Sequence, residues 1–221
     1  MERETGRSVS LRVFMRKPMT LKEKIIDESL RLFSARGYMN TSTMDIITAA
    51  GTSKGGFYNH FKTKDELFTS VLSRARKIWR EKNLAGLDGE AHPLDRLKRL
   101  LTNYRDRYLT DARTFPGGCI FITFAVELAG QSPELANEVN EGFTRLRRMI
   151  KRLLDDGKKA GLVVPEADTS RVTEIVFSGL LGACVMYNLD HSRRNLNATI
   201  QSLIQSLNDI RPDGKSAPPR W

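Results

Sequence analysis

Apolar residues recur at helical spacing along most of the chain, and no segment alternates apolar and polar residues as a half-buried strand does. The first periodic segment runs from about Thr20 to Ala35, and Gly37 then ends it. Similar segments follow to about residue 210, separated by short runs that contain Gly, Pro and Ser. The pattern predicts an all-α protein of about nine helices.

Two of the predicted helices are short and follow each other closely. One covers residues 43–50 and the next begins after Ser53, with Gly51 between them. Gly51 can take the left-handed conformation that ends a helix, and the Ser53 hydroxyl can cap the following one. This arrangement is typical of a helix-turn-helix, whose second helix lies in the major groove of DNA. An ordinary helical hairpin with a polar face has the same pattern.

The second short helix carries side chains suited to phosphates and base edges rather than to catalysis. Phe57 and Phe61, four residues apart, are expected to hold this helix on the core. The predicted phosphate contacts are Lys54, Tyr58, His60 and Lys64, with Thr43 and Ser53 contributing hydroxyls or helix N-termini. The predicted groups nearest the base edges are Asn59 and the backbone at Gly55 and Gly56.

Residues 25–38, Thr41–Thr43 and 51–67 together resemble the N-terminal domain of TetR-family transcriptional regulators. The sequence departs from the family pattern at Thr52, where an apolar residue is usual. It departs again at Gly56, where many members carry a side chain that could reach a base. The resemblance implies a three-helix DNA-binding domain, a larger helical domain that holds a small-molecule effector, and a homodimer. Such a dimer is expected to bind an inverted-repeat operator in double-stranded DNA.

The predicted organisation has four parts. They are a basic flexible arm at 1–19, a helix-turn-helix domain at 20–66, an effector-binding and dimerisation domain at 67–210, and a disordered tail at 211–221. Thr63 and Glu66 form a predicted capping box that opens a fourth helix, which crosses the domain boundary and can act as a lever. The arm either reaches DNA or is a disordered leader, and its later methionines offer alternative starts.

Charge and composition agree with a DNA-binding protein of the cytoplasm. The formal net charge is +10 and the isoelectric point is about 9.8, which fits a polyanionic partner. The chain has no secretory signal, and both cysteines, Cys119 and Cys184, fall in apolar helical segments where they are expected as small core residues. The longest apolar runs are shorter than the roughly twenty residues that cross a bilayer, so no membrane partner is predicted.

The sixth predicted helix, from Cys119 to Ala129, is apolar on almost every side. Its exceptions, Thr123 and Glu127, lie on one stripe, which either faces solvent or supplies polar contacts to a ligand cavity. The predicted cavity residues are Tyr104, Tyr108, Phe121, Thr123, Phe124, Glu127 and Phe177. The resemblance gives no chemical class for the effector.

The last two predicted helices combine small residues with an aliphatic stripe. They can close the core of one chain or, as the resemblance implies, meet a second copy in a four-helix interface. The predicted interface residues are Ser178, Gly179, Gly182, Ala183, Leu196, Ile200, Leu203, Ile204 and Leu207. We favour the dimer, because one short recognition helix alone would bury little DNA surface.

A helical enzyme with a basic surface is the main rival reading. The three histidines are scattered without metal-ligand spacing, and the sequence has neither a glycine-rich phosphate loop nor a nucleophile elbow. We therefore predict no catalytic residues, metal or cofactor. The sequence favours a ligand-responsive transcriptional regulator, a repressor rather than an activator. An architectural DNA-binding protein without an effector is the third reading, and it would have no cavity behind the sixth helix.

Overall fold

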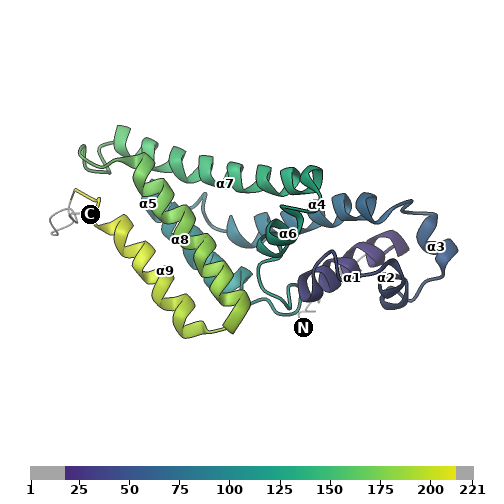
Figure 1. Ribbon diagram of the computed structural model, residues 1–221. Helices are drawn as coiled ribbons and strands as arrows, with labels where there is room; N and C mark the ends of the chain where they lie inside the picture. Colours follow the sequence, from purple (N-terminus) through teal and green to yellow (C-terminus); the bar gives the residue numbers. More distant parts are fainter. Residues whose placement is uncertain (1–17, 213–221) are drawn as a thin grey trace, which may run out of the picture.

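The computed structural model describes residues 18–212, and within that range the chain is helical, without strands (Figure 1). The all-α prediction is confirmed, and so is the number of α-helices in this range. The elements are α1 (Leu21–Arg36), α2 (Thr43–Ala49), α3 (Lys54–Tyr58), α4 (Lys64–Asn83), α5 (Pro93–Asn103), η1 (Tyr104–Tyr108), α6 (Ile120–Leu128), α7 (Pro133–Lys159), α8 (Thr169–Asp190) and α9 (Arg193–Asn208). Most of the predicted arm and tail lies outside the described residues.

The first three helices form a small domain around the fully buried side chains of Ile25, Phe33 and Phe57. α1 begins with a reciprocal capping box between Thr20 and Glu23, which satisfies backbone N–H groups at its first turn. Figure 1 shows α3 at one end of the molecule, with α8 and α9 toward the other. The recognition helix is therefore held away from the bulk of the C-terminal domain.

α4 is the element that the two parts of the molecule share. It packs on α1 and also contacts α5, η1 and α7. The Thr63 hydroxyl caps the helix by accepting the Glu66 N–H at 3.0 Å, as predicted. The Glu66 carboxylate accepts from the N–H of Lys62 rather than from that of Thr63, so the reciprocal half of the expected capping box lies one residue earlier.

The C-terminal domain contains a feature that helical periodicity did not predict. The expected fifth helix changes at Tyr104 into a π-helical turn, in which the Leu109 N–H bonds to the Tyr104 carbonyl at 2.9 Å. Such turns insert an extra residue and redirect side chains, often at functional sites. Here Tyr104 and Tyr108 both point inward, with their rings in edge contact at 5.5 Å.

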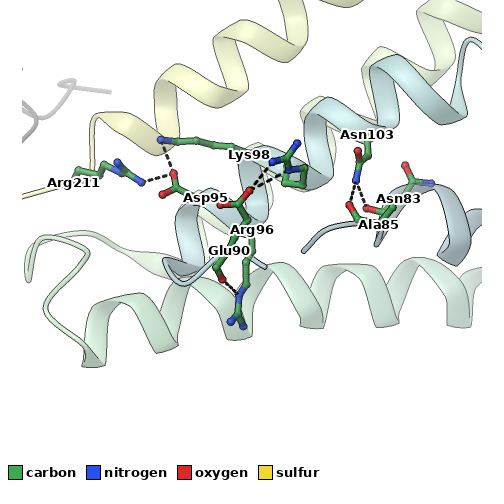
Figure 2. A network of polar contacts seen from close by, with 9 residues as sticks. Asn83, Ala85, Glu90, Asp95, Arg96, Lys98, Asn103 and Arg211 are labelled. Atoms are coloured by element: carbon green, nitrogen blue, oxygen red, sulfur yellow. Dashed lines mark hydrogen bonds and ion pairs between the residues drawn. The ribbon is translucent and has the colours of Figure 1, made fainter. Parts of the chain in front are cut away.

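A polar network stabilises the end of the domain farthest from α3 (Figure 2). The Asn103 amide donates to the carbonyls of Asn83 and Ala85 at 3.0 and 2.9 Å, which fixes the connection after α4. Asp95 pairs with Arg211 and with Lys98, so the chain after α9 is tied to α5. The predicted tail therefore begins too early, because Arg211 still belongs to the packed domain.

Candidate DNA interface and ligand cavity

The recognition helix α3 is short and held from both ends. At its start, the Ser53 hydroxyl accepts the Gly56 N–H at 3.1 Å, as the sequence predicted. Phe57 and Phe61 are buried on the core side, while Tyr58 on the opposite side is 46% exposed. Lys54 and Asn59 are also exposed, and His60 is half-buried. α3 therefore presents a polar face to solvent at one end of the molecule.

The preceding helix is oriented by its own cap. Ser42 and Asp45 form a capping box, in which the Asp45 carboxylate accepts the Ser42 N–H at 2.8 Å and the Ser42 hydroxyl accepts the Asp45 N–H at 3.1 Å. These bonds from Ser42 lower the pKa of the Asp45 carboxyl below its usual value. Gly51 has a φ of +59°, the left-handed turn predicted between the two helices. Thr43, half-exposed, occupies the first position of α2.

The two departures from the family pattern occupy one place in the structure. A Cβ atom added at Gly56 would lie 2.4 Å from the Thr52 Oγ1, too close for an ordinary contact. The polar residue in the turn is thus accommodated by the absence of a side chain on α3. Gly55 is different, because a Cβ there would meet only the Ser53 hydroxyl, at 3.8 Å.

Lys64 has partners inside the protein. Its ammonium donates to the carbonyls of Tyr38 and Thr41 at 2.8 and 3.0 Å, and it lies 4.1 Å from the centre of the Tyr38 ring. Burial lowers the pKa of the Lys64 ammonium, while the charges of Asp65 and Glu127 partly oppose that shift. In the free chain these bonds hold the Lys64 side chain at the start of α4, against the turn that follows α1.

Tyr38 is the centre of a cluster that the sequence analysis did not identify. Its hydroxyl donates to the Asp65 carboxylate, and its backbone N–H donates to the Glu127 carboxylate at 2.7 Å. Burial and the Asp65 carboxylate raise the pKa of the Tyr38 phenol well above its usual value. We call the set Gly37, Tyr38, Lys64, Asp65 and Glu127 the Tyr38 junction. It joins the end of α1, the start of α4 and the end of α6.

Glu127 was predicted to contact an effector, and the structure corrects that assignment. Its carboxylate is used by Tyr38 and also fills the space next to Gly37, where an added Cβ would lie 1.8 Å from Oε1. Phe124, on the same helix, packs edge-on against Phe68 at 4.8 Å and Phe33 at 6.1 Å. The end of α6 is therefore a contact surface for the DNA-binding domain.

A cavity of about 430 Å³ lies between α4, η1, α6 and α7. Its lining is Ser73, Arg76, Trp79, Arg80, Leu84, Tyr104, Phe121, Val139, Gly142, Phe143, Arg145, Leu146 and Met149. Of the seven predicted cavity residues, Tyr104 and Phe121 line it. The other five do not. Tyr108 and Phe124 are fully buried in the core, Phe177 packs against Phe143 at 6.5 Å, and the Thr123 hydroxyl donates to the Cys119 carbonyl.

The predicted dimer surface is also only partly available. Leu196, Ile200, Leu203, Leu207 and Ala183 are buried within the one chain, where α9 packs on α8 and α5. A Cβ at Gly179 would lie 2.6 Å from a methyl of Leu203, so this glycine allows α9 to approach α8. Within one chain these residues pack against one another, so little of their surface is left for a partner. Ile204 is half-buried.

A different stripe of α8 is uncovered. Ser178 and Gly182 are exposed, and an added Cβ at Gly182 meets nothing within 4 Å. The stripe continues through Val185, Met186 and Leu189, whose side chains are 39%, 52% and 74% exposed. We call these five residues the α8 face. In the described part of the chain, α8 alone has the length and hydropathy of a membrane span, a property that buried helices of soluble domains share.

The fold and its site define a class: a helix-turn-helix protein whose long fourth helix connects the DNA-binding domain to a helical domain with a cavity. The family model "Bacterial regulatory proteins, tetR family" matches residues 25–71, and "Tetracyclin repressor-like, C-terminal domain" matches residues 93–203. The chain belongs to the TetR family of transcriptional regulators and is a DNA-binding, ligand-responsive regulator. Regulators of this family act as dimers on DNA operators and are not enzymes.

Related proteins and structures agree with this placement. The HTH-type transcriptional repressor DhaR of Mycobacterium sp. (strain GP1) is 23% identical over 85% of this chain and 92% of its own. The HTH-type transcriptional regulator AcrR of Shigella flexneri is 34% identical over 61% of this chain and 64% of its own. A TetR transcriptional regulator from Chloroflexus aurantiacus superimposes with a TM-score of 0.79 and 26% identity, covering 86% of this chain and 96% of that one.

Proposed function

We propose that this protein is a homodimeric repressor that leaves an inverted-repeat operator when a small molecule enters the cavity between α4, α6 and α7. One observation supports this most directly. α6 lines the cavity with Phe121 and, less than two turns later, holds the DNA-binding domain through the Glu127 carboxylate, which accepts the Tyr38 N–H. A ligand that moves α6 therefore changes the support of α1 and α4.

The proposed DNA surface is the exposed side of α2 and α3. Lys54 provides a flexible positive charge at the start of α3, with Tyr58 and His60 at its end. The remaining members of the proposed contact set are Thr43, Ser53, Gly55, Gly56 and Asn59. Direct reading of bases rests on few groups, because Gly55 and Gly56 have no side chains and contribute only backbone. Lys64 acts on DNA indirectly, by fixing the Tyr38 junction.

The proposed dimer forms through the α8 face. An isolated five-residue recognition helix buries little DNA surface, so two copies on one operator are needed for specific affinity. Small Ser178 and Gly182 allow a second helix to approach, and the exposed apolar side chains beside them gain burial. A two-fold pair then places its recognition helices in successive major grooves, which requires a symmetric operator.

The proposed switch is a shift between two packings of α4 and α6. A ligand changes this equilibrium only by binding one packing better than the other. A difference of about 3 kcal/mol in ligand affinity would weaken operator binding roughly a hundredfold. Operator DNA must then weaken ligand binding by the same factor. The domain limits proposed from the sequence, 20–66 and 67–210, divide α4, so this helix belongs to both domains. We place the protein in the cytoplasm, where its DNA partner is.

The experiment that tests this function is footprinting on the DNA that flanks the protein's own gene. We expect protection of two half-sites related by two-fold symmetry and about one helical turn, or a small multiple, apart. Reporter expression from the same DNA should rise when the gene is deleted. Protection of a single unsymmetric site, or a fall in expression on deletion, would contradict the dimeric repressor.

A further inference from the structure

The cavity contains an excess of positive charge that a purely apolar pocket does not need. Three arginines, Arg76, Arg80 and Arg145, line it, and none of its lining residues is acidic. Two of them lie on α4 four residues apart, and the third faces them from α7. Charged side chains are rare in ligand pockets unless they orient a ligand. The three arginines therefore indicate the charge of the ligand that the cavity binds.

Arg76 is the innermost of the three. One of its terminal nitrogens donates to the Glu138 carbonyl on α7, but its Nε is buried and has no hydrogen-bond partner within the described residues. Burial lowers the pKa of this guanidinium and nearby Arg145 and Arg80 lower it further, against the opposing charges of Glu138 and Glu141. A buried donor without an acceptor is costly, and an acceptor oxygen beside it removes that cost.

Arg80 and Arg145 lie nearer the opening of the cavity. Both are exposed, as is Ser73, so the cavity meets solvent on this side. Arg145 pairs with Glu141 at 3.1 Å, one turn away on α7. The Arg80 side chain, by contrast, has no ion pair or hydrogen bond to any residue in the range 18–212. The Arg80 guanidinium can therefore bind a ligand without breaking any contact that holds the fold together.

The rest of the lining is mainly apolar and aromatic. Trp79, Phe121, Phe143, Leu146 and Met149 surround the space beyond the arginines. The Tyr104 hydroxyl accepts from the Trp79 indole at 2.6 Å and keeps its own proton for another acceptor. Its pKa is raised well above the usual value by burial, so it stays a neutral donor. The cavity thus has a cationic end and an apolar end.

We infer that the effector is an organic acid with an apolar body, whose carboxylate binds Arg76 and Arg80 while its body lies against Phe121, Leu146 and Met149. This inference rests on the proposed function and names the ligand class of that site. The fork of an arginine matches a carboxylate in shape and charge. An organic cation would meet three like charges without an acidic partner in the lining.

The test uses three molecules that share one apolar chain: decanoate, decanol and decylamine. Binding is followed by the fluorescence of Trp79, which lines the cavity, in a Trp221→Phe background, because the chain has two tryptophans. Octanoate and dodecanoate extend the series in length. The variants are Arg76→Gln and Arg80→Gln, and within residues 18–212 the Arg80 side chain has no partner to lose. The matched control is Arg152→Gln, an exposed arginine of α7 outside the lining.

We expect decanoate to bind at least about tenfold more tightly than decanol, with decylamine the weakest, because only the acid pairs with the arginines. Arg80→Gln should weaken decanoate about tenfold and leave decanol unchanged, while Arg152→Gln changes neither. Decanol affinity equal to that of the acids, an acid affinity indifferent to Arg80, or an acid series that does not bind would overturn the inference.

Operator release, measured separately, distinguishes the two proposals. If acids bind in the cavity but leave operator affinity unchanged, the ligand class stands and the ligand-induced release fails. If a neutral or cationic compound releases the operator while acids do not bind, the repressor mechanism stands and the ligand class fails.

Discussion

The Glu127 carboxylate and the Tyr38 backbone N–H, 89 positions apart in the sequence, meet in a hydrogen bond of 2.7 Å. Their bond connects α6, which lines the cavity, to the turn that follows α1. From the sequence, α4 alone was expected to transmit a movement between the two domains. The structure adds a second connection, which enters the DNA-binding domain at the Tyr38 junction, beside the start of α4.

We predict that Glu127→Leu is destabilising whereas Glu127→Gln is nearly neutral. The glutamine amide oxygen can still accept the Tyr38 N–H, but leucine leaves that donor, on buried Tyr38, without a partner. The expected loss for leucine is about 1–3 kcal/mol in the free energy of unfolding, measured by urea denaturation. Equal stability of the two variants would show that the hydrogen bond does not hold α6 to the DNA-binding domain.

Gly37→Ala and Gly86→Ala can be compared. Both glycines have positive φ, +84° and +78°, so alanine is strained at each, and at Gly37 a ψ of 166° adds strain because this combination is essentially confined to glycine. Only at Gly37 would the new Cβ also meet the Glu127 carboxylate, whereas at Gly86 nothing lies within 4 Å. Gly37→Ala should therefore cost clearly more stability in thermal or urea unfolding. Similar losses at both positions would mean that the junction adjusts freely.

Lys54→Ala tests the docking of α3. If its ammonium neutralises one phosphate, the variant should bind all DNA sequences more weakly, and the slope of log affinity against log salt should fall by about one unit. Lys77→Ala is the control, because Lys77 is also exposed but lies on α4 beyond the DNA-binding domain. Titrations at several salt concentrations give both slopes. An unchanged slope for Lys54→Ala would place α3 away from the backbone.

Gly182→Glu and Gly179→Ala separate association from folding. Gly182 faces open space, so glutamate should leave the fold intact and, on the α8 face, produce monomers with weak operator affinity. Gly179→Ala would push against Leu203 in the same chain and should lower thermal stability. Sedimentation and thermal melting together resolve the two effects. A Gly182→Glu protein that stays dimeric would put the interface elsewhere.

Asp45→Asn should change how stability depends on pH. The folded pKa of Asp45 is lowered by its bonds with Ser42, so its contribution is present above the unfolded pKa near 3.8 and is lost as pH falls through the folded value. The variant should be less stable than the parent at neutral pH, and the difference should shrink below pH 3.8. Unfolding curves across that range measure it. A difference that does not vary with pH would exclude the carboxylate's charge as its cause.

The N-terminal domain was largely predictable because its signals are local. Ser53 caps α3, Gly51 turns the chain and Phe57 is buried, as spacing of a few residues indicated. The role of Glu127 was not predictable in this way. Its position on an apolar helix marked it as exceptional, but its partner Tyr38 comes from a distant part of the chain.

Amphipathic patterns further along the chain were ambiguous for a physical reason. The stripe of α9 that includes Leu203 needs an apolar neighbour, and the pattern does not say whether α8 or a second copy provides it. The cavity arginines were missed because a charged residue on a helix is usually solvated. The one available signal was the spacing of Arg76 and Arg80, four apart on the side of α4 that carries Trp79.

The Tyr38 junction also sets a rule for recombining this protein with its relatives. A chimera that takes its first sixty residues from another regulator and its effector domain from this one separates the Tyr38 side chain from Asp65 and Lys64, although the cut falls in a surface turn. The Glu127 carboxylate still meets a backbone N–H at position 38, but a side chain other than tyrosine leaves Asp65 without its hydroxyl donor. A chimera with a different DNA specificity therefore needs two residues that fit each other, one on each side of the crossover. Exchanging one contiguous block is not enough.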